Sequence, residues 1–433
     1  MSATAAITSD SVLSAARTLV QELFGHCEPP DFSVRFWDNS VWRPPAATSD
    51  LRCTLVINHP GALRVLLSGD NLRLGEAYIY DAIDVEGDIE GVFTLADALM
   101  GHKWHLTQKV RFARLASHLP VFDISHQRLH NAHLAGKVHS FDRDRRAIHH
   151  HYDISNEFYR LWLDDRMVYS CAYFQSAEDD LGTAQLQKLD YICRKLRLQP
   201  GERFLDVGCG WGALIIHAAL NYGVNATGIT LSREQAQMAN ERIRKSGLNE
   251  RCRVEIRDYR ELDSWERFDK IASVGMFEHV GEELLPEYFE RTFRLLRPGG
   301  VFLNHGIARA QCAPKPKRPT FISTYVFPDG DLVPISTTMR FAEAAGFELR
   351  DLESLREHYS ITLHNWLQRL QRNADAIRRM TDEVTYRIFR LYLSGSAHWF
   401  ATARNNVHQA LLAKPDRGRS GLPLTRADWY TAK

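Results

Sequence analysis

The sequence lacks both long apolar runs and a strong imbalance of charge. Its 433 residues carry 54 Lys and Arg against 53 Asp and Glu, a formal net charge of +1. This balance argues against nucleic-acid binding through the net charge of the whole chain, so any function that needs positive charge must use a local basic patch. No stretch approaches the roughly 18 uninterrupted apolar residues that a membrane-spanning helix needs. The densest stretch, residues 213–220, is typical of a helix in a protein core.

Cysteine is scarce and unpaired. The seven cysteines form no C-x-x-C motif and are odd in number, which favours reduced thiols over a disulfide framework or a zinc site. The three consecutive histidines 149–151 would point in different directions on a helix or strand, and no carboxylate completes a ligand set. The first ten residues lack the charged and apolar regions of a secretory leader. We therefore expect a cytoplasmic protein without a structural metal.

The length and the 44% hydrophobic content predict two globular units. An amphipathic helix at 11–24 and strand-like segments at 33–37 and 52–58 predict a small α+β domain. Residues 101–150 carry nine Lys and Arg, three Asp and Glu, and nine His, which indicates a basic, His-rich linker. The predicted organisation is a small N-terminal domain at 1–100, the linker at 101–150, a larger domain at 151–413 and a flexible C-terminal tail at 414–433.

The larger domain alternates short strands with helices, which predicts an α/β fold with a doubly wound, Rossmann-like parallel sheet. The predicted strands are 203–207, 225–230, 253–257, 270–274 and 301–305. The predicted helices are 214–220, 232–247 and 282–296, the last stopped by the Arg-Pro-Gly-Gly segment at 297–300, followed by helical patterns at 362–372 and 383–412.

A glycine-rich turn, G-x-G-x-G within residues 205–212, follows the first strand and precedes a helix. Alone it indicates no more than a tight βα turn. Three features resemble the S-adenosylmethionine fold of class I methyltransferases rather than a nicotinamide site. Asp206 lies in the strand end, the third glycine comes one residue earlier than in G-x-G-x-x-G, and Asp258 ends the third strand.

Polar residues at the ends of the strands are candidate cofactor ligands. Asp258, with Tyr259 beside it, could accept from an adenine amino group, although an Asp that simply ends a strand is the plain alternative. The usual acidic ribose ligand is missing after the second strand, where Thr230 stands, and Gln235 could supply a polar partner or only cap a helix. The candidate cofactor-binding residues on these strands are Asp206, Gly208, Gly210, Gly212, Thr230, Gln235, Asp258 and Tyr259.

Eight separated motifs resemble cyclopropane-fatty-acyl-phospholipid synthases and their relatives that methylate unsaturated lipid chains. They are His151-Tyr-Asp-Ile-Ser-Asn-Glu-Phe158, Met167-Val-Tyr-Ser-Cys-Ala-Tyr-Phe174, Leu205-Asp-Val-Gly-Cys-Gly-Trp-Gly212, Gly228-Ile-Thr-Leu-Ser232, Asp258-Tyr-Arg260, Val274-Gly-Met-Phe-Glu-His-Val-Gly281, Tyr325-Val-Phe-Pro-Asp-Gly330 and His358-Tyr-Ser-Ile-Thr-Leu363. The motifs fall within 151–400, whereas the first 140 residues match the family's smaller lipid-facing domain more loosely.

The resemblance implies methyl transfer from S-adenosylmethionine to the double bond of an unsaturated phospholipid acyl chain. The resulting carbocation would lose a proton to a bound bicarbonate ion, which closes a cyclopropane ring. By resemblance, two backbone N–H groups and three side chains hold that ion: Cys171 and Ile307, then Glu278, His305 and Tyr359. Tyr169 and Ser170 would close over the cofactor, with the Tyr169 ring near the sulfonium.

Each of these residues also has a plain structural explanation. His305 can be a buried histidine with satisfied hydrogen bonds, Cys171 a small packed hydrophobe, Tyr359 a surface aromatic and Tyr169 a core ring. Their simultaneous match at separated positions favours the bicarbonate site.

The sequence departs from the family at two positions. Ser396 stands where a family segment often carries a cysteine once suggested as catalytic, which excludes a covalent cysteine there, and Ala213 follows the glycine-rich turn. The product could be a ring, a methylene branch or a methyl branch, since the proton can leave from the delivered methyl or from a neighbouring carbon. Two other classes stay open: a methyltransferase for a small soluble acceptor, and a catalytically silent lipid- or cofactor-binding protein.

An enzyme that acts on membrane phospholipid must dock on the bilayer. Residues 106–119 place Lys109, Arg111 and Arg114 among apolar residues, a pattern that fits an anionic surface but also an ordinary amphipathic core helix. The resemblance favours peripheral contact with the inner face of the membrane, and it leaves a homodimer open.

Overall fold

The computed structural model describes residues 9–47, 49–123, 130, 134, 136–152, 154–262, 265–313 and 315–430, with backbone only for 149–152. These residues form two compact units. Unit 1 comprises Met1–Asn131, Pro316–Val326 and Thr381–His398, and unit 2 comprises Ala132–Lys315, Phe327–Met380 and Trp399–Lys433. The predicted domain boundaries stay a prediction. Unit 1 differs from the predicted N-terminal domain because it also includes Pro316–Val326 and Thr381–His398.

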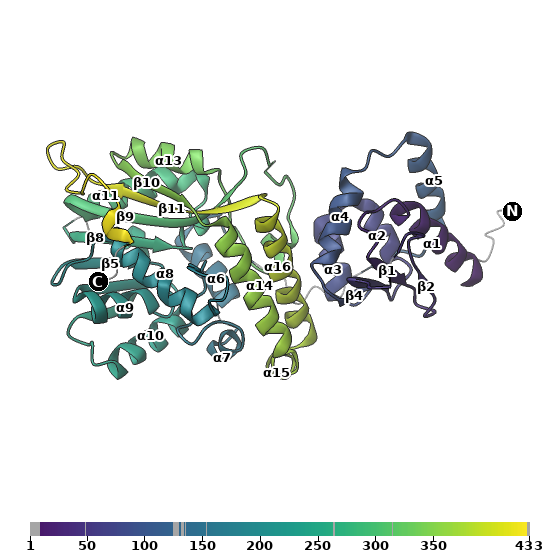
Figure 1. Cartoon of the computed structure of the whole chain (residues 1–433), viewed down its shortest axis with the longest axis horizontal. Helices are drawn as coiled ribbons and strands as arrows, with labels where there is room; N and C mark the ends of the chain where they lie inside the picture. Colours follow the sequence, from purple (N-terminus) through teal and green to yellow (C-terminus); the bar gives the residue numbers. More distant parts are fainter. Residues whose placement is uncertain are drawn as a thin grey trace. The chain divides into compact units, whose positions relative to one another are not determined.

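Unit 1 contains a four-stranded sheet in the order β2-β1-β3-β4 (Figure 1). The strands are β1 (Phe32–Arg35), β2 (Val41–Trp42), β3 (Cys53–Ile57) and β4 (Ile83–Gly87), with β1 and β3 parallel. Its N-terminal helices are α1 (Ser9–Phe24), α2 (Ala62–Ser68), α3 (Asn71–Ile79), α4 (Gly91–Gly101) and α5 (Leu106–Ser117). The predicted small α+β domain is confirmed, including its first helix and two of its strands.

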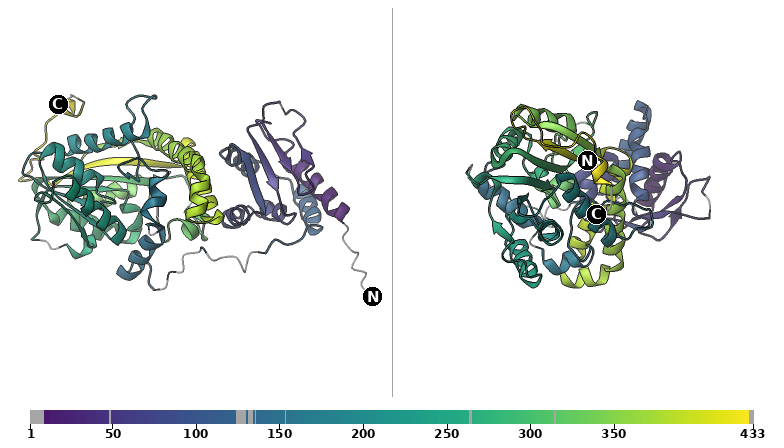
Figure 2. Two further views of the ribbon diagram at one scale, coloured as in Figure 1. Left: turned by 90° about the horizontal axis from the view of Figure 1, so that it is seen from below. Right: turned by 60° about the vertical axis from the view of Figure 1, so that its left-hand side comes forward.

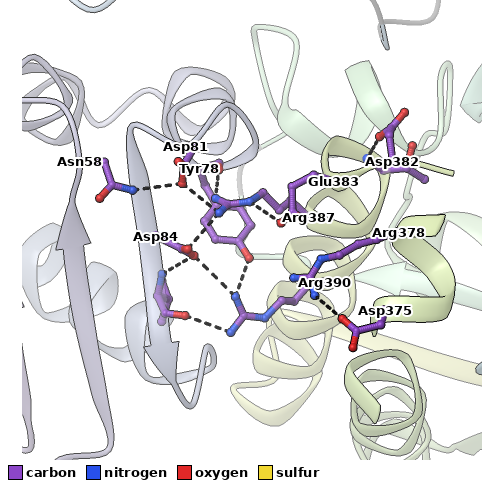
Figure 3. A network of polar contacts seen from close by, with 12 residues as sticks. Asn58, Tyr78, Asp81, Asp84, Asp375, Arg378, Asp382, Glu383, Arg387 and Arg390 are labelled. Carbon is purple, nitrogen blue, oxygen red and sulfur yellow. Dashed lines mark hydrogen bonds and ion pairs between the residues drawn. The ribbon is translucent and has the colours of Figure 1, made fainter. Parts of the chain in front are cut away.

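Two later segments complete unit 1, namely α12 (Phe321–Tyr325) and most of α16 (Glu383–Ala401). Arg387 of α16 donates hydrogen bonds to Tyr78 O at 2.8 Å and to Asp81 Oδ1 and Asp84 Oδ2 at 2.9 Å (Figure 3). Arg390 donates to the Tyr78 hydroxyl at 2.8 Å. Arg387 is largely buried, and a buried cation is tolerated only when it is paired and hydrogen-bonded, so this network specifies how α16 packs.

Unit 2 is built on a seven-stranded sheet in the order β10-β11-β9-β8-β5-β6-β7. The strands are β5 (Arg203–Val207), β6 (Asn225–Thr230), β7 (Cys252–Ile256), β8 (Phe268–Val274), β9 (Leu296–Arg309), β10 (Glu348–Ser354) and β11 (Asn405–Ala413). Strands β5 to β9 run parallel, and β11 inserts antiparallel between β9 and β10. The predicted Rossmann-like α/β fold is confirmed.

Helices cover both faces of this sheet (Figures 1 and 2), and neighbouring residues along β5 belong to two different cores. Phe204 packs with residues of α8 (Leu181–Leu196), α9 (Ala213–Tyr222) and α10 (Arg233–Lys245). Its neighbour Leu205 packs with residues of α11 (Leu285–Leu295) and α13 (Ile335–Ala344). Strands buried on both faces explain the nearly continuous apolar runs that made them recognisable in the sequence.

One predicted strand start and one predicted helix end were wrong. Residues 297–300 already belong to β9, which begins at Leu296 instead of 301, and the helix predicted to run to 412 ends at Ala401. Residues 405–413 instead form β11, because their backbone pairs with both β9 and β10. A short apolar stretch buried on both faces has no period that separates strand from helix, so sequence pattern misassigned it. The helix predicted to end at 296 ends at Leu295, within one residue of the prediction. Helix α14 (Arg356–Arg372) confirms the predicted 362–372 helix and begins earlier, at Arg356.

The C-terminal segment, predicted to be a flexible tail, contacts α8. Trp429 is buried, Arg194 donates to its carbonyl at 3.1 Å, and Arg197 pairs with Asp428 at 2.7 Å. The flexibility of this segment stays a prediction. Within the ranges given above, no helix combines the length and apolar character needed to span a bilayer.

Candidate active site

The carboxyl ends of β5, β6 and β8 border one cavity in unit 2. Nine of the ten predicted cofactor residues line it: Tyr169, Ser170, Asp206, Gly208, Gly210, Thr230, Gln235, Asp258 and Tyr259. Gly212 does not line the cavity. It precedes α9 with a φ of +80°, and a Cβ there would lie 3.1 Å from Ala239 Cβ, so it serves the packing of α9 against α10.

The glycine-rich turn brings bare backbone to the cavity. The N–H groups of Gly208 and Cys209 both donate to Ile229 O at 3.0 Å, which fastens the turn to the end of β6. Gly208 has a φ of +81°, and a Cβ there would lie 2.6 Å from Met276 Cβ. Only glycine fits this position, and the turn therefore offers a close approach for a ligand.

Two buried ionisable side chains, Asp206 and Lys188, line the cavity. Asp206 is 2% exposed, its Oδ1 has no hydrogen-bond partner among the described residues, and burial raises its pKa to about 7. Lys188 of α8 donates to Ser170 Oγ at 2.8 Å, and burial lowers the pKa of its amine to about 8. Gln185 donates to Ser170 O at 2.9 Å. Lys188 and Gln185 were not identified as site residues from the sequence. The signal was present, because two polar residues on the apolar face of an amphipathic helix indicate a buried polar site.

Asp258 is held by Arg260, which the sequence placed in the Asp258-Tyr-Arg260 motif but to which no role was assigned. Arg260 Nη2 lies 2.7 Å from Asp258 Oδ2 and 2.8 Å from Asp144 Oδ2, and its guanidinium stacks 4.1 Å from the Phe141 ring centroid. Phe141 and Asp144 belong to α6 (Phe141–Tyr152), which was predicted as linker. Because Asp144 also lines the cavity, this segment contributes to the site.

Two further buried side chains lie next to cavity-lining residues, Glu278 in the 3-10 turn Phe277–His279 and His305 on β9. Ile307 N–H donates to Glu278 Oε1 at 2.8 Å, while Glu278 Oε2 is buried and has no partner among the described residues. Burial raises the pKa of Glu278 to about 7, against the opposing effect of the Ile307 hydrogen bond. His305 precedes Ile307 on the same strand, and its carbonyl accepts from the N–H of Gly275, a cavity-lining residue, at 2.9 Å.

The tautomer of His305 follows from its neighbour. Gln409 Nε2 lies 3.1 Å from His305 Nδ1, so an amide donor there leaves the proton on Nε2. His305 Nε2 is buried without a partner among the described residues. Burial, assisted by the cations of Lys188 and Lys195 and by His408, holds the pKa of His305 well below its usual value. His305 therefore offers a neutral N–H donor and Glu278 an acceptor, each buried without a partner among the described residues.

The structure brings Cys171 and Tyr359 to the same end of the sheet. The Cys171 thiol approaches Leu355 O at 3.7 Å, and Tyr359 N–H donates to the same carbonyl at 3.0 Å. Leu355 N–H donates to Val407 O, and Val407 lies opposite Ile307 in the β9–β11 pair. Burial raises the pKa of the Cys171 thiol far above its usual range, so this cysteine is no thiolate nucleophile.

Residues 139–410, more than half of the chain, match the family described as mycolic acid cyclopropane synthetase. The chain belongs to this family. Residues 19–103 match a domain of unknown function. A probable fatty acid methyltransferase of Pseudomonas putida is 39% identical over 381 residues, which cover 87% of this chain and 91% of that protein. Cyclopropane mycolic acid synthase 1 of Mycobacterium tuberculosis is 37% identical over 270 residues, 60% of this chain and 93% of its own length.

Solved structures agree with this assignment. The mycolic acid cyclopropane synthase CmaA1, solved with S-adenosylhomocysteine, is 36% identical, covers 62% of this chain and 97% of its own, and has a TM-score of 0.59. The cyclopropane synthase MmaA2 from Mycobacterium tuberculosis is 33% identical, with a TM-score of 0.59, and covers 64% of this chain and 99% of its own. The chain is thus a methyltransferase of the cyclopropane synthase family that uses S-adenosylmethionine, as its motifs predicted.

An aromatic cluster connects the cofactor cavity of this family member to Tyr359. The ring centroids of Tyr159 and Trp211 lie 5.1 Å apart, those of Tyr159 and Tyr169 5.7 Å, and those of Tyr169 and Trp366 5.2 Å. Trp366 lies 6.0 Å from Tyr359. The sequence showed each ring, but only folding gathers them into a water-poor wall whose π faces suit a nearby cation.

Metal ligation is not evident in the part of the chain that the structure describes. There, no group of three or more His, Cys, Asp or Glu side chains is arranged to hold an ion. The side chains of His149, His150 and His151 lie outside the described residues.

The burial of Glu278 predicts a pH-dependent cost to stability. The pKa of about 7 in the folded chain exceeds the unfolded value of 4.5, so the folded chain binds more protons and loses stability as the pH rises from 4.5 to 7. Glu278→Gln removes this ionisation and keeps an acceptor for Ile307. We expect its melting temperature to exceed that of the wild type by several degrees at pH 8 and by much less at pH 5. Thermal melts of the ligand-free protein, with exposed Glu283→Gln as the control, measure this; an equal gap at both pH values would contradict it.

Proposed function

We propose that this enzyme transfers the methyl group of S-adenosylmethionine to the double bond of an unsaturated phospholipid acyl chain and forms a cyclopropane ring. The names of the relatives, a fatty acid methyltransferase and a cyclopropane mycolic acid synthase, support an acyl chain as acceptor. The observation that carries the proposal is that two polar atoms near the cavity-lining residues Gly275 and His279, a donor at His305 and an acceptor at Glu278, are each buried without a partner among the described residues; we call them the buried pair.

The cavity residues fit S-adenosylmethionine. The turn at Gly208 admits a ligand close to the backbone, and the carboxylates of Asp206 and Asp258 can accept from hydroxyl and amino groups. Thr230 Oγ1 donates to Gln235 Oε1 at 2.8 Å, and both residues line the cavity where an acidic ribose ligand would otherwise stand. The Tyr169 ring would face the sulfonium. When bound, S-adenosylmethionine supplies an electrophilic methyl group.

Methylation of an alkene requires a base in a dry site. As the π electrons of the alkene form a bond to the methyl carbon, the bond from that carbon to sulfur would break with its electron pair left on sulfur, and the other alkene carbon would become a cation. Loss of a proton from the new methyl lets that C–H electron pair close the three-membered ring, whereas loss from a neighbouring chain carbon leaves a methyl-branched alkene. A methylene branch requires a hydride to shift to the cationic carbon first, so that the proton then leaves from the methyl group. An amine or hydroxyl acceptor would release its proton to water and would need no buried base.

The buried pair fits bicarbonate as that base. His305 Nε2–H would donate to an anionic oxygen of bicarbonate, and Glu278 Oε2 would accept from the bicarbonate hydroxyl. That hydrogen bond explains how a carboxylate can lie beside an anion without net repulsion. The Ile307 N–H already donates to Glu278, so Ile307 would act by orienting that carboxylate. Cys171 and Tyr359, which share the Leu355 carbonyl, would complete the site. When bound, bicarbonate would supply the proton acceptor.

Phospholipid is the proposed carrier of the acyl chain. Cyclopropane mycolic acid synthase 1 matches only 60% of this chain, so this chain has an additional part that a mycolic acid synthase does without. A phospholipid acyl chain is reached at a bilayer surface, and we place the enzyme in peripheral contact with the cytoplasmic face of the membrane.

The test is to incubate the purified chain with labelled S-adenosylmethionine and vesicles of monounsaturated phospholipid. The acyl chains are then released and their masses are measured by mass spectrometry. We expect a gain of about 14 mass units, one CH₂, with the double bond lost, as ring closure requires. The same gain with an alkene retained would replace the cyclopropane by a methylene-branched or methyl-branched product. Label in a small soluble acceptor and none in lipid would overturn the proposal, and no transfer at all would favour a silent binding protein.

A further inference from the structure

Helix α5 of unit 1 exposes an apolar stripe. Its buried side contains Phe112, which packs 5.0 Å from the Trp104 ring. Leu106, Val110 and Ala113 follow one another at spacings of four and three residues, so they share the opposite side of the helix. Leu106 and Val110 are 77% and 62% exposed. A helix that covers a core normally turns polar residues to this side, so the stripe calls for a partner.

Further exposed apolar side chains lie in the segments that flank α5. Met100, near the end of α4, is 68% exposed, and Val121, which follows α5, is 65% exposed. Val41 is the only other large apolar residue with such exposure among the described residues 9–123. The exposed apolar side chains of the N-terminal part of unit 1 are therefore concentrated in residues 100–121.

Cations frame this stripe. Lys109 and Arg114 emerge on either side of it, and Lys103 precedes the helix. The sequence contains no Asp or Glu between Asp97 and Asp123. Arg111 pairs with Glu22 of α1, whereas Lys103, Lys109 and Arg114 form no ion pair with another described residue. The charged side chains around the stripe are thus all positive.

The charge selects the partner. Two copies of this chain that paired through α5 would bring Lys109 and Arg114 of one close to the like charges of the other, which opposes association. A bilayer that contains anionic phospholipid offers acyl chains to the stripe and phosphates to the cations. An amphipathic helix with cations beside its apolar stripe suits that interface.

We propose that α5, through Leu106, Val110 and Ala113 with Lys103, Lys109 and Arg114, is the surface by which this protein binds an anionic phospholipid bilayer. The inference deepens the proposed function, on which it rests, because it states which face meets the bilayer that holds the substrate. The helix lies in the plane of the interface, with its apolar stripe among the upper acyl carbons and its cations at the phosphates.

The experiment measures sedimentation of the full chain with vesicles of phosphatidylglycerol and phosphatidylcholine in equal parts, and with vesicles of phosphatidylcholine alone. The wild type should bind the anionic vesicles at least about tenfold more tightly, and the difference should shrink in about 0.5 M salt. Leu106→Asp with Val110→Asp should weaken binding to anionic vesicles by about tenfold or more, since charge enters the apolar stripe. Leu220→Asp, at a similarly exposed leucine on α9 in unit 2, is the matched control and should bind as the wild type.

A second variant keeps the test independent of folding. Lys109→Gln with Arg114→Gln changes only exposed side chains and should lower anionic binding while the melting temperature stays unchanged. Binding of both double variants at wild-type strength would overturn the proposal. A change from a dimeric to a monomeric mass in light scattering would also overturn it, because α5 would then be a protein interface.

Activity separates this surface from the proposed function. Leu106→Asp with Val110→Asp should lose methylation of vesicle lipid yet keep methylation of the same phospholipid dispersed in detergent micelles. If the wild type binds anionic vesicles through α5 but methylates no lipid in either form, the proposed function fails and the surface stands. If methylation of vesicle lipid survives the double variant unchanged, the surface fails and the proposed function stands.

Discussion

Replacement of Glu278 by glutamine should lower kcat for lipid methylation by roughly 100- to 10,000-fold, the range that a positioned acid–base group contributes. The glutamine amide would keep an acceptor for Ile307 N–H but would present no carboxylate for the hydroxyl of the proposed base. Glu278 lies outside the lining of the cofactor cavity, so affinity for S-adenosylhomocysteine should stay within about twofold. Steady-state transfer of labelled methyl and calorimetric titration with S-adenosylhomocysteine measure the two effects.

Glu283→Gln, at an exposed glutamate five residues further on, is the control and should retain the wild-type rate. Removal of dissolved bicarbonate should slow the wild type and Glu283→Gln but not the residual rate of Glu278→Gln. His305→Ala should resemble Glu278→Gln, since it removes the donor of the same pair. Loss of cofactor affinity in Glu278→Gln, or a wild-type rate, would mean that Glu278 does not act at the proposed step.

The Gly208→Ala substitution should weaken binding of S-adenosylhomocysteine by about 10- to 100-fold. A side chain at a φ of +81° is strained, and its Cβ would meet Met276 Cβ at 2.6 Å, so the turn must move away from the position that admits the ligand. Calorimetric titration measures the affinity directly. Methyl transfer should fall mainly through a higher KM for the cofactor, and saturating cofactor should restore much of kcat.

Gly201→Ala is a control that introduces similar backbone strain away from the cofactor cavity. Gly201 has a φ of +82°, nearly that of Gly208, but a Cβ there would have no neighbour within 4 Å, and it does not line the cavity. This control should lose some thermal stability and keep its affinity for S-adenosylhomocysteine. An equal loss of affinity in both variants would show that backbone strain, and not the approach at Gly208, controls binding.

Local sequence pattern was sufficient where neighbouring residues decide the structure. Strands β5 and β6 begin and end as predicted, and Ser232 caps α10 by accepting from Gln235 N–H. Pattern failed at β11, whose Asn405–Ala413 backbone pairs with β9 and β10. The partners of β11 lie between about 50 and 110 residues away, and no local period records them.

The candidate site divides in the same way. The motifs identified Asp206, Gly208 and Asp258 because their positions follow from a strand, a turn and a strand end. Lys188 lies in no motif, and Arg260 was quoted within the Asp258-Tyr-Arg260 motif without a role, because the importance of both comes from burial beside Ser170 and Asp258. The membrane-facing residues proposed on α5 were noticed as a basic amphipathic pattern, but the sequence could not say which side of the helix was buried.

By itself, the sequence determined the Rossmann-like fold, the small N-terminal α+β domain and the family with its cofactor. These depend on hydrophobic period, on glycine in a strained turn and on motif order, all of which are written in consecutive residues. Only the tertiary structure decided that Ile307 donates to Glu278, that Gln409 sets the tautomer of His305 and that α16 joins unit 1. Those features depend on desolvation and on hydrogen bonds between residues 29, 104 and about 300 positions apart, which exist only once the chain has folded.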